Sequence, residues 1–182
     1  MTEVKETSLL VEGMRSYPKT LAALNEFGRL VISTIRDITV EELGSVSNAM
    51  HLDRKEDELA DYVRPNRLAI PNPKDAILGV KIDRIGKSGW GLYFYLWWSK
   101  GETKLGVSLW LRDGTVAESV FTVLNKLSST TAVELDAGHE VYVSRTLAAG
   151  NPDQLPIGLR ELIQEFSDLW SKAEGLEKFL KA

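Results

Sequence analysis

The sequence predicts a single α+β domain for its 182 residues. Near both ends of the chain, apolar residues recur every three or four positions, as they do in amphipathic helices. Between residues 76 and 112 the period changes to two, which is typical of strands. We therefore expect a helical segment over residues 15–52 and a mixed core of sheet and helix over residues 76–182. A chain of this length can bury a sizeable core.

One apolar stripe predicts that the N-terminal segment is helical. Ser16 and Pro18 favour a helix start, because proline is tolerated in the first turn. The stripe consists of Leu21, Leu24, Phe27, Val31, Ile35 and Ile38. Thr39 and Glu42 have the spacing of a capping box, so the helix either ends there and a second one begins, or continues as a single long helix.

Two irregular segments follow the helical part. The charge-dense residues 53–62 are expected to form a solvated helix or loop. Residues 64–73 contain three prolines, which exclude a regular helix. This second segment is therefore predicted to be a linker between the helical part and the mixed core.

A three-stranded antiparallel meander is predicted from residue 76 onward. Residues 78–82 alternate between apolar and polar side chains, residues 86–89 supply a turn, and residues 90–112 predict a β-hairpin. In the first strand of the hairpin both alternating rows are apolar, which is typical of a strand covered on both faces. We assign to the core the row formed by Phe94, Leu96 and Trp98. The opposite row, which either a helix or a ligand covers, consists of Tyr93, Tyr95 and Trp97.

The C-terminal part is predicted to contain a helix, two short strands and a longer helix. Thr115 and Glu118 have capping-box spacing, which opens a helix lying across one face of the meander. Strands over residues 132–135 and 140–145 flank a turn, and they either pair with each other or join into one bent strand. The last helix begins near Pro156 and carries a broad apolar stripe, which docks either on the sheet or on another copy of the protein. The second alternative implies a homo-oligomer, in the simplest case a homodimer, formed through the C-terminal helix.

The composition disfavours several classes of function. A net charge of -4 and an isoelectric point near 5.3 argue against a broad nucleic-acid-binding face. The absence of cysteine excludes disulfides, thiolate metal sites and cysteine nucleophiles, and it fits a cytoplasmic protein. No stretch approaches the roughly 18 apolar residues of a membrane span, and residues 1–14 lack a signal-peptide pattern. With only two histidines and none of the common nucleotide-binding or nucleophile motifs, we expect no metal ion and no cofactor.

The aromatic residues of the hairpin form the first candidate site. Tyr93, Tyr95, Trp97 and Trp110 are predicted to line a ligand pocket or a stacking platform, because aromatic rings stack on planar ligands. The alternative is a purely structural role, since large aromatic side chains are strong core formers. Gly106 favours the first interpretation, because a glycine in a strand leaves room for something to approach the sheet.

The second candidate site consists of Asp83, Glu102 and Lys104. Their D...E-x-K order resembles the active site of the metal-dependent PD-(D/E)XK nucleases. In that family two carboxylates hold a divalent cation that activates water, and the lysine supports the nucleophile or the phosphate. The resemblance covers these three residues and implies phosphodiesterase chemistry. A salt bridge on the surface of the hairpin is the structural alternative.

The function predicted from the sequence is a non-enzymatic binding or protein-interaction module that presents aromatic side chains from a central antiparallel sheet. Its ligand is either a small molecule or another protein. The alternative function is that of a metal-dependent phosphodiesterase or nuclease-like protein that uses Asp83, Glu102 and Lys104. A groove of aromatic side chains favours binding, whereas oxygen atoms that converge on a common point favour an enzyme.

Overall fold

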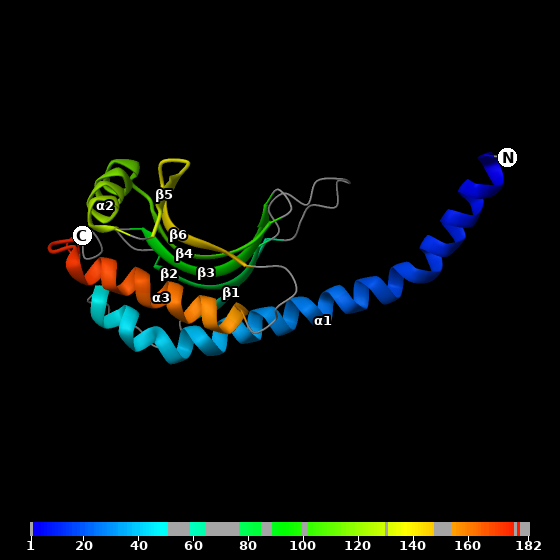
Figure 1. Cartoon of the computed structure of the whole chain (residues 1–182), viewed down its shortest axis with the longest axis horizontal. Helices are drawn as coiled ribbons and strands as arrows, with labels where there is room; N and C mark the ends of the chain where they lie inside the picture. The colour runs from blue at the N-terminus through cyan, green and yellow to red at the C-terminus, as the bar shows by residue number, and fades with distance from the viewer. Residues whose placement is uncertain are drawn as a thin grey trace.

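The fold consists of one curved antiparallel sheet with two long helices packed against its convex face and a shorter helix at its edge (Figure 1). The computed structural model describes residues 2–50, 59–64, 77–84, 89–99, 102–129, 131–147, 154–176 and 178. Its elements are α1 (Thr2–Met50), β1 (Ala60–Arg64), β2 (Ile77–Arg84), β3 (Trp90–Ser99), β4 (Glu102–Leu111), α2 (Gly114–Leu127), β5 (Val133–Asp136), β6 (Glu140–Leu147) and α3 (Gln154–Lys172). These elements confirm the predicted α+β class.

The six strands lie in the order β1-β2-β3-β4-β6-β5, and every neighbouring pair is antiparallel. Strands β2, β3 and β4 form the predicted meander. Strands β5 and β6 pair with each other across the turn at residues 137–139, so the alternative of one bent strand is wrong.

Strand β1 lies in a stretch for which the sequence predicts no strand. Arg36 of α1 holds it in place. The guanidinium of Arg36 donates to the carbonyl oxygen of Leu59 at 3.1 Å and to Oδ1 of Asp61 at 2.6 Å. Most of the predicted linker, residues 65–73, lies outside the described residues.

The two sides of β3 separate as the alternation predicts. Leu92, Phe94 and Leu96 are buried in the core together with residues of α1 and α3. Trp98 is half-buried on the same side, and its ring centroid lies 6.2 Å from that of Phe27 in α1. The intervening residues of β3 point to the opposite face of the sheet.

Helix α1 is longer than the sequence predicts. It runs without a break from Thr2 to Met50, and Thr39 is buried within it, so the predicted helix end at Thr39 is wrong and the alternative of a single long helix holds. Pro18 lies inside the helix, where its missing N–H removes one backbone hydrogen bond. The second half of α1 lies along α3 and the sheet, whereas the first half extends beyond the sheet (Figure 1).

Helix α2 begins before the predicted capping box. Its N-cap is Asp113, whose Oδ1 accepts hydrogen bonds from the backbone N–H of Thr115 at 2.8 Å and of Val116 at 3.4 Å. The helix packs beside β5, at the edge of the sheet, instead of across the meander (Figure 1). Its predicted position is therefore wrong, because β5 and β6 extend the sheet and supply the surface that α2 covers.

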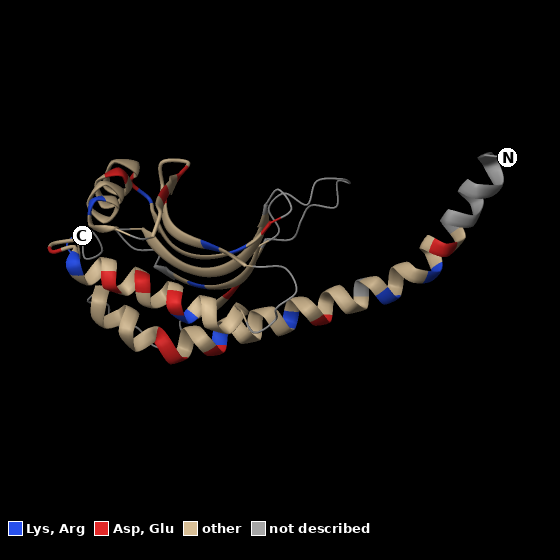
Figure 2. Ribbon diagram, in the orientation of Figure 1, with Lys and Arg blue, Asp and Glu red and all other residues tan. Residues whose placement is uncertain are grey.

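Helix α3 packs within its own chain. Its apolar stripe is buried against α1 and the sheet, which leaves that stripe unavailable for the predicted contact with another copy. Charged residues of both signs lie along α1 and α3 (Figure 2), and Arg160 of α3 pairs with Glu41 of α1. Within the described part of the chain, no helix has the length and apolar character needed to cross a membrane.

Candidate functional site

The sheet has a concave face that lies opposite the core, and we call it the open face. The strand register places on it Tyr62 of β1, Ile77 of β2, Tyr95 and Trp97 of β3, and Tyr142 of β6. Figure 1 shows that the concave side of the sheet faces away from α1 and α3. The buried side chains of all three helices belong to the core on the other side, so no helix among the described residues covers the open face.

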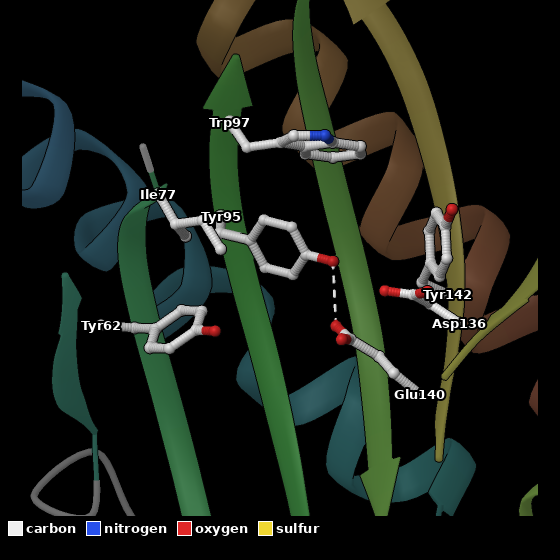
Figure 3. Close-up of a pocket in the computed structure, with 7 residues that line it drawn as sticks. All are labelled: Tyr62, Ile77, Tyr95, Trp97, Asp136, Glu140 and Tyr142. Atoms are coloured by element: carbon white, nitrogen blue, oxygen red, sulfur yellow. Dashed lines mark hydrogen bonds between the residues drawn. The ribbon is translucent and has the colours of Figure 1, made fainter. Parts of the chain in front are cut away.

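A pocket of about 260 Å³ lies on the open face (Figure 3). It is lined by Tyr62, Ile77, Tyr95, Trp97, Asp136, Glu140 and Tyr142. The lining comes from five of the six strands, and the remaining strand, β4, passes beneath the rings of β3 (Figure 3). The pocket therefore combines aromatic walls with two carboxylates.

Gly106 of β4 allows the rings of β3 to lie across the neighbouring strand. A Cβ atom at this position would lie 2.8 Å from Cζ3 of Trp97 and 3.0 Å from the ring of Tyr95. The absence of a side chain at Gly106 therefore accommodates two rings of the same chain. The sequence interpretation that Gly106 leaves room for a ligand is wrong for this position, because Tyr95 and Trp97 fill that space.

Aromatic contacts join the pocket walls into one cluster. The ring centroids of Tyr95 and Trp97 are 5.2 Å apart, and those of Trp97 and Tyr142 are 6.3 Å apart. Tyr62 lies 6.1 Å from Tyr95 and 4.9 Å from Tyr93. Because each such pair contributes roughly 0.5–1.5 kcal/mol beyond the burial of its area, the cluster holds the rings in position before any ligand binds.

Two tyrosine hydroxyls of the pocket, those of Tyr95 and Tyr142, are hydrogen-bonded to carboxylates. The Tyr95 hydroxyl donates to Oε1 of Glu140 at 3.0 Å, and the Tyr142 hydroxyl donates to Oε2 of Glu134 at 2.8 Å. Burial and the nearby negative charge raise the pKa of Tyr95 well above its usual value of 10.0. Burial and the hydrogen bond to Glu134 raise the pKa of Tyr142 as well. Both hydroxyls are therefore protonated donors at neutral pH and do not act as bases.

Ser108 of β4 lies on the same face, beside Tyr95. Its buried Oγ makes no hydrogen bond of ordinary geometry, yet the hydroxyl is near enough to Tyr95 to oppose part of the increase in pKa. Tyr95 itself is only 6% exposed but does not belong to the core cluster on the other side of the sheet. Among the described residues, Tyr95 is therefore buried on the open-face side of the sheet.

These raised pKa values predict a loss of stability in alkaline solution. Above about pH 10, tyrosines of the unfolded chain lose their protons while Tyr95 and Tyr142 of the folded chain keep theirs. Unfolding then releases protons, so the stabilisation is complete below pH 10 and falls as the pH rises toward the folded pKa values. Urea unfolding between pH 8 and 11 measures this decrease, which should be shallower in Tyr95→Phe. An identical pH dependence in both proteins would contradict the assignment to Tyr95.

Three of the four aromatic residues predicted for the site belong to the aromatic cluster. Tyr95 and Trp97 line the pocket, and Tyr93 lies beside it, in contact with the ring of Tyr62. Trp110 is separate from this cluster. It is 37% exposed near the other end of β4, and its ring centroid lies 6.2 Å from that of His139.

The sequence interpretation missed the carboxylates and the tyrosines that complete the pocket. Asp136 and Glu140 are register partners at the turn between β5 and β6, and Tyr142 pairs with Glu134 two residues further along each strand, on the same face. The alternation of Val133 and Leu135 with acidic residues was a usable signal, since it marks one wet side of a strand. The position of these acidic residues next to the aromatic rings depends on the pairing of β4 with β6, and these two strands are far apart in the sequence.

The structure does not bring Asp83, Glu102 and Lys104 together. Asp83 pairs with Gly91, and Gly91 pairs with Trp110 of β4. Glu102 lies eight residues from Trp110 along β4, which corresponds to about 26 Å at roughly 3.3 Å per residue. Asp83 and Glu102 are therefore at opposite ends of the hairpin. Glu102 instead forms an ion pair with Lys104, with Oε2 3.4 Å from Nζ. This is the hairpin salt bridge that the sequence offered as the structural alternative.

No protein-family model, curated protein or solved structure matches the chain. Among the described residues, no group of three or more His, Asp or Glu side chains is arranged to hold a metal ion. The chemistry of the pocket therefore carries the functional proposal.

Proposed function

We propose that this protein is a non-enzymatic binding module whose open face receives a ligand and whose pocket accepts a cationic group, an ammonium or a guanidinium. The observation that carries this proposal is the composition of the pocket. Asp136 and Glu140 stand beside the rings of Tyr95, Trp97 and Tyr142, and no cationic side chain is among the seven lining residues.

Aromatic faces and carboxylates attract the same kind of ligand. A cation over an aromatic ring is attracted by the negative face of the ring, with a contribution of about 0.5–2 kcal/mol that increases when water is excluded. The hydroxyl of Tyr95 fixes the position of the Glu140 carboxylate by donating to one oxygen. A carboxylate accepts several hydrogen bonds, so Glu140 retains capacity for a donor on the ligand.

The same charge disfavours anionic ligands. Glu134, Asp136 and Glu140 lie on one side of the open face, where phosphate groups would meet like charge. Within the pocket a cationic group is therefore favoured over a phosphate, whose affinity for proteins depends on contacts with cationic side chains. The lysines of the open face, Lys81 and Lys104, lie outside the pocket lining.

A panel of small ligands tests the proposal. We expect choline and arginine amide to raise the melting temperature of the protein in a saturable way, because a ligand at 100 times its Kd stabilises the folded state by about 2.7 kcal/mol. The neutral isostere of choline, 3,3-dimethyl-1-butanol, should have a much smaller effect, and acetate should have none. Equal effects of choline and the neutral isostere, or no effect of any cation, would refute the proposal.

The Glu140→Gln variant separates charge from shape. Glutamine keeps an oxygen that accepts from the Tyr95 hydroxyl, so we expect the aromatic cluster to persist. Affinity for choline should decrease about tenfold, as expected for one lost charge contact near a partly buried site. An unchanged affinity would show that the carboxylate plays no part in binding.

The cationic group has two conceivable sources, a free small molecule or a side chain of a protein partner. Short peptides that contain trimethyl-lysine or arginine distinguish them. If the partner is a protein, such peptides should bind more tightly than choline, because flanking residues add contacts on the open face. If the ligand is a small molecule, the peptides should bind no better than choline.

A further inference from the structure

A large aromatic side chain is exposed on the open face beside the pocket. Trp110 of β4 alternates with Leu109 and Leu111, which are buried in the core, so its side chain lies on the opposite face of the sheet. Its residue is 37% exposed, although the ring of His139 lies beside the indole with the two centroids 6.2 Å apart. The aromatic residues that line the pocket are half-buried or buried, so Trp110 is more exposed than any of them.

Trp110 lies in one row across the sheet with the two carboxylates of the pocket. The register pairs Trp110 of β4 with Glu140 of β6, and it pairs Glu140 with Asp136 of β5. The Cβ atoms of directly paired residues on one face are about 5 Å apart, so the three side chains follow one another within about 10 Å. The two carboxylates line the pocket, whereas Trp110 lies just outside its lining.

The pocket is too small to enclose a large ligand. Its volume is about 260 Å³, and pockets that bury a drug-sized molecule typically have about 300–1,000 Å³. It therefore has room for a small headgroup or for one side chain, and a ligand confined to it ends before Trp110. Contact with Trp110 requires a ligand that extends out of the pocket past Glu140.

An arginine side chain matches the acidic end of the pocket (Figure 3). Its planar guanidinium has five N–H donors and stacks on aromatic rings. Asp136 is exposed, and Glu140 accepts from the Tyr95 hydroxyl at one oxygen, Oε1, so both carboxylates have capacity for further donors. The quaternary ammonium of choline has no N–H to give them, whereas a guanidinium can donate to both.

We propose that the open face binds a polypeptide segment whose arginine enters the pocket and whose neighbouring apolar residue packs on Trp110. This inference rests on the proposed cation site and names the partner that supplies the cation. In an extended segment, side chains two positions apart point the same way and are about 7 Å apart. This spacing lies between the distances of about 5 and 10 Å that separate Trp110 from the two carboxylates. Tryptophan and arginine are also enriched among the residues that dominate the binding energy of protein interfaces.

Calorimetric titration of the full chain with three peptides tests the inference. The first is a heptapeptide with blocked ends that has a central arginine, a leucine two positions to either side and glycine elsewhere. Either direction of this peptide places a leucine at Trp110, so we expect it to bind at least tenfold more tightly than arginine amide. In the second peptide glycine replaces both leucines, which should remove this gain. In the third, citrulline replaces arginine as its neutral isostere, which should abolish measurable binding.

Substitutions at Trp110 separate the peptide contact from the pocket. Trp110→Ala should weaken binding of the leucine peptide about tenfold, to the affinity of the glycine peptide, and should leave the affinity for arginine amide within a factor of two. Trp110→Phe keeps an aromatic ring and should recover most of the loss. Ile157→Ala is the matched control, because Ile157 is 56% exposed on α3, which packs on the other side of the sheet. This control should bind all three peptides as the wild-type protein does.

The outcomes distinguish this inference from the proposed function. If neither choline nor arginine amide binds, the cation site is wrong and the inference falls with it. If both bind but the leucine peptide binds no more tightly than arginine amide, the ligand is a free small molecule and the inference alone fails. It also fails if Trp110→Ala leaves the affinity for the leucine peptide unchanged, or weakens arginine amide by the same factor. Equal binding of the arginine and citrulline peptides would overturn the role of the arginine.

Discussion

Replacing Gly79 with alanine is expected to lower the free energy of unfolding by about 3 kcal/mol or more. A Cβ atom at this position would lie 2.7 Å from Cα of Tyr95 and would also overlap the carbonyl oxygen of Phe94. Both are backbone atoms of the paired strand, so the clash is relieved only if β2 and β3 separate. Because Tyr95 and Trp97 belong to β3, the same displacement disturbs the pocket.

Gly44→Ala is the matched control for this substitution. Gly44 lies inside α1, and no atom outside its own helix lies within 4 Å of an added Cβ. Alanine is the better helix former, so this variant should be more stable than wild type by about 0.5–1 kcal/mol. Urea unfolding of both variants, followed by circular dichroism, makes the comparison. A Gly79→Ala protein as stable as wild type would contradict the pairing of β2 with β3.

Replacing Trp97 with leucine is expected to lower the affinity for choline about tenfold. Leucine keeps an apolar side chain on the open face but removes the ring that stands between Tyr95 and Tyr142. A cation loses an aromatic contact of about 1–2 kcal/mol in a partly desolvated pocket, and 1.4 kcal/mol corresponds to a factor of ten in Kd. Isothermal titration calorimetry measures the change.

Trp110→Leu serves as the control for Trp97→Leu. Trp110 is on the open face but outside the pocket lining, so its replacement should leave the affinity for choline within a factor of two. Near-ultraviolet circular dichroism verifies that both variants remain folded. Equal losses of affinity in the two variants would show that choline binds to the open face without preference for the pocket.

The central hairpin could be predicted from the sequence because its signal is local. The alternation in β3 assigns Phe94 and Leu96 to one side and Tyr95 and Trp97 to the other, and the structure confirms this separation. A period of two follows directly from the pleat of a strand. The fold class could be predicted for the same reason, since each helix and most strands have their own periodicity.

Features that depend on contacts remote in sequence could not be predicted. Strand β1 depends on Arg36 of α1 and on pairing with β2, and its five residues lie at the end of a charge-dense run and are too few to show a period of two. The capping box at Thr39 failed as a helix end because burial of Thr39 against the rest of the core stabilises the continuous helix. In both cases tertiary packing outweighs local preference.

The candidate site was only half visible in the sequence. Tyr95 and Trp97 were predicted from the strand that carries them, whereas Asp136 and Glu140 reach the pocket through the pairing of β4 with β6. The prediction of an active site from the D...E-x-K order failed because the length of β4 separates Asp83 from Glu102 and Lys104. Residues along an extended strand are about 3.3 Å apart per position, so residues at its two ends are distant in space. The order and register of the strands determine which residues of other strands lie beside them.

The most direct test of the binding site is the position of a cation on the open face, measured by nuclear magnetic resonance. The five tryptophans give five indole N–H signals, and Trp97→Leu identifies that of Trp97. Titration with choline is predicted to shift the Trp97 signal in a saturable way and to leave the Trp110 signal in place, while 3,3-dimethyl-1-butanol shifts neither at the same concentration. A Trp97 signal that does not respond to choline, or that responds equally to the neutral isostere, would contradict a cation site in this pocket.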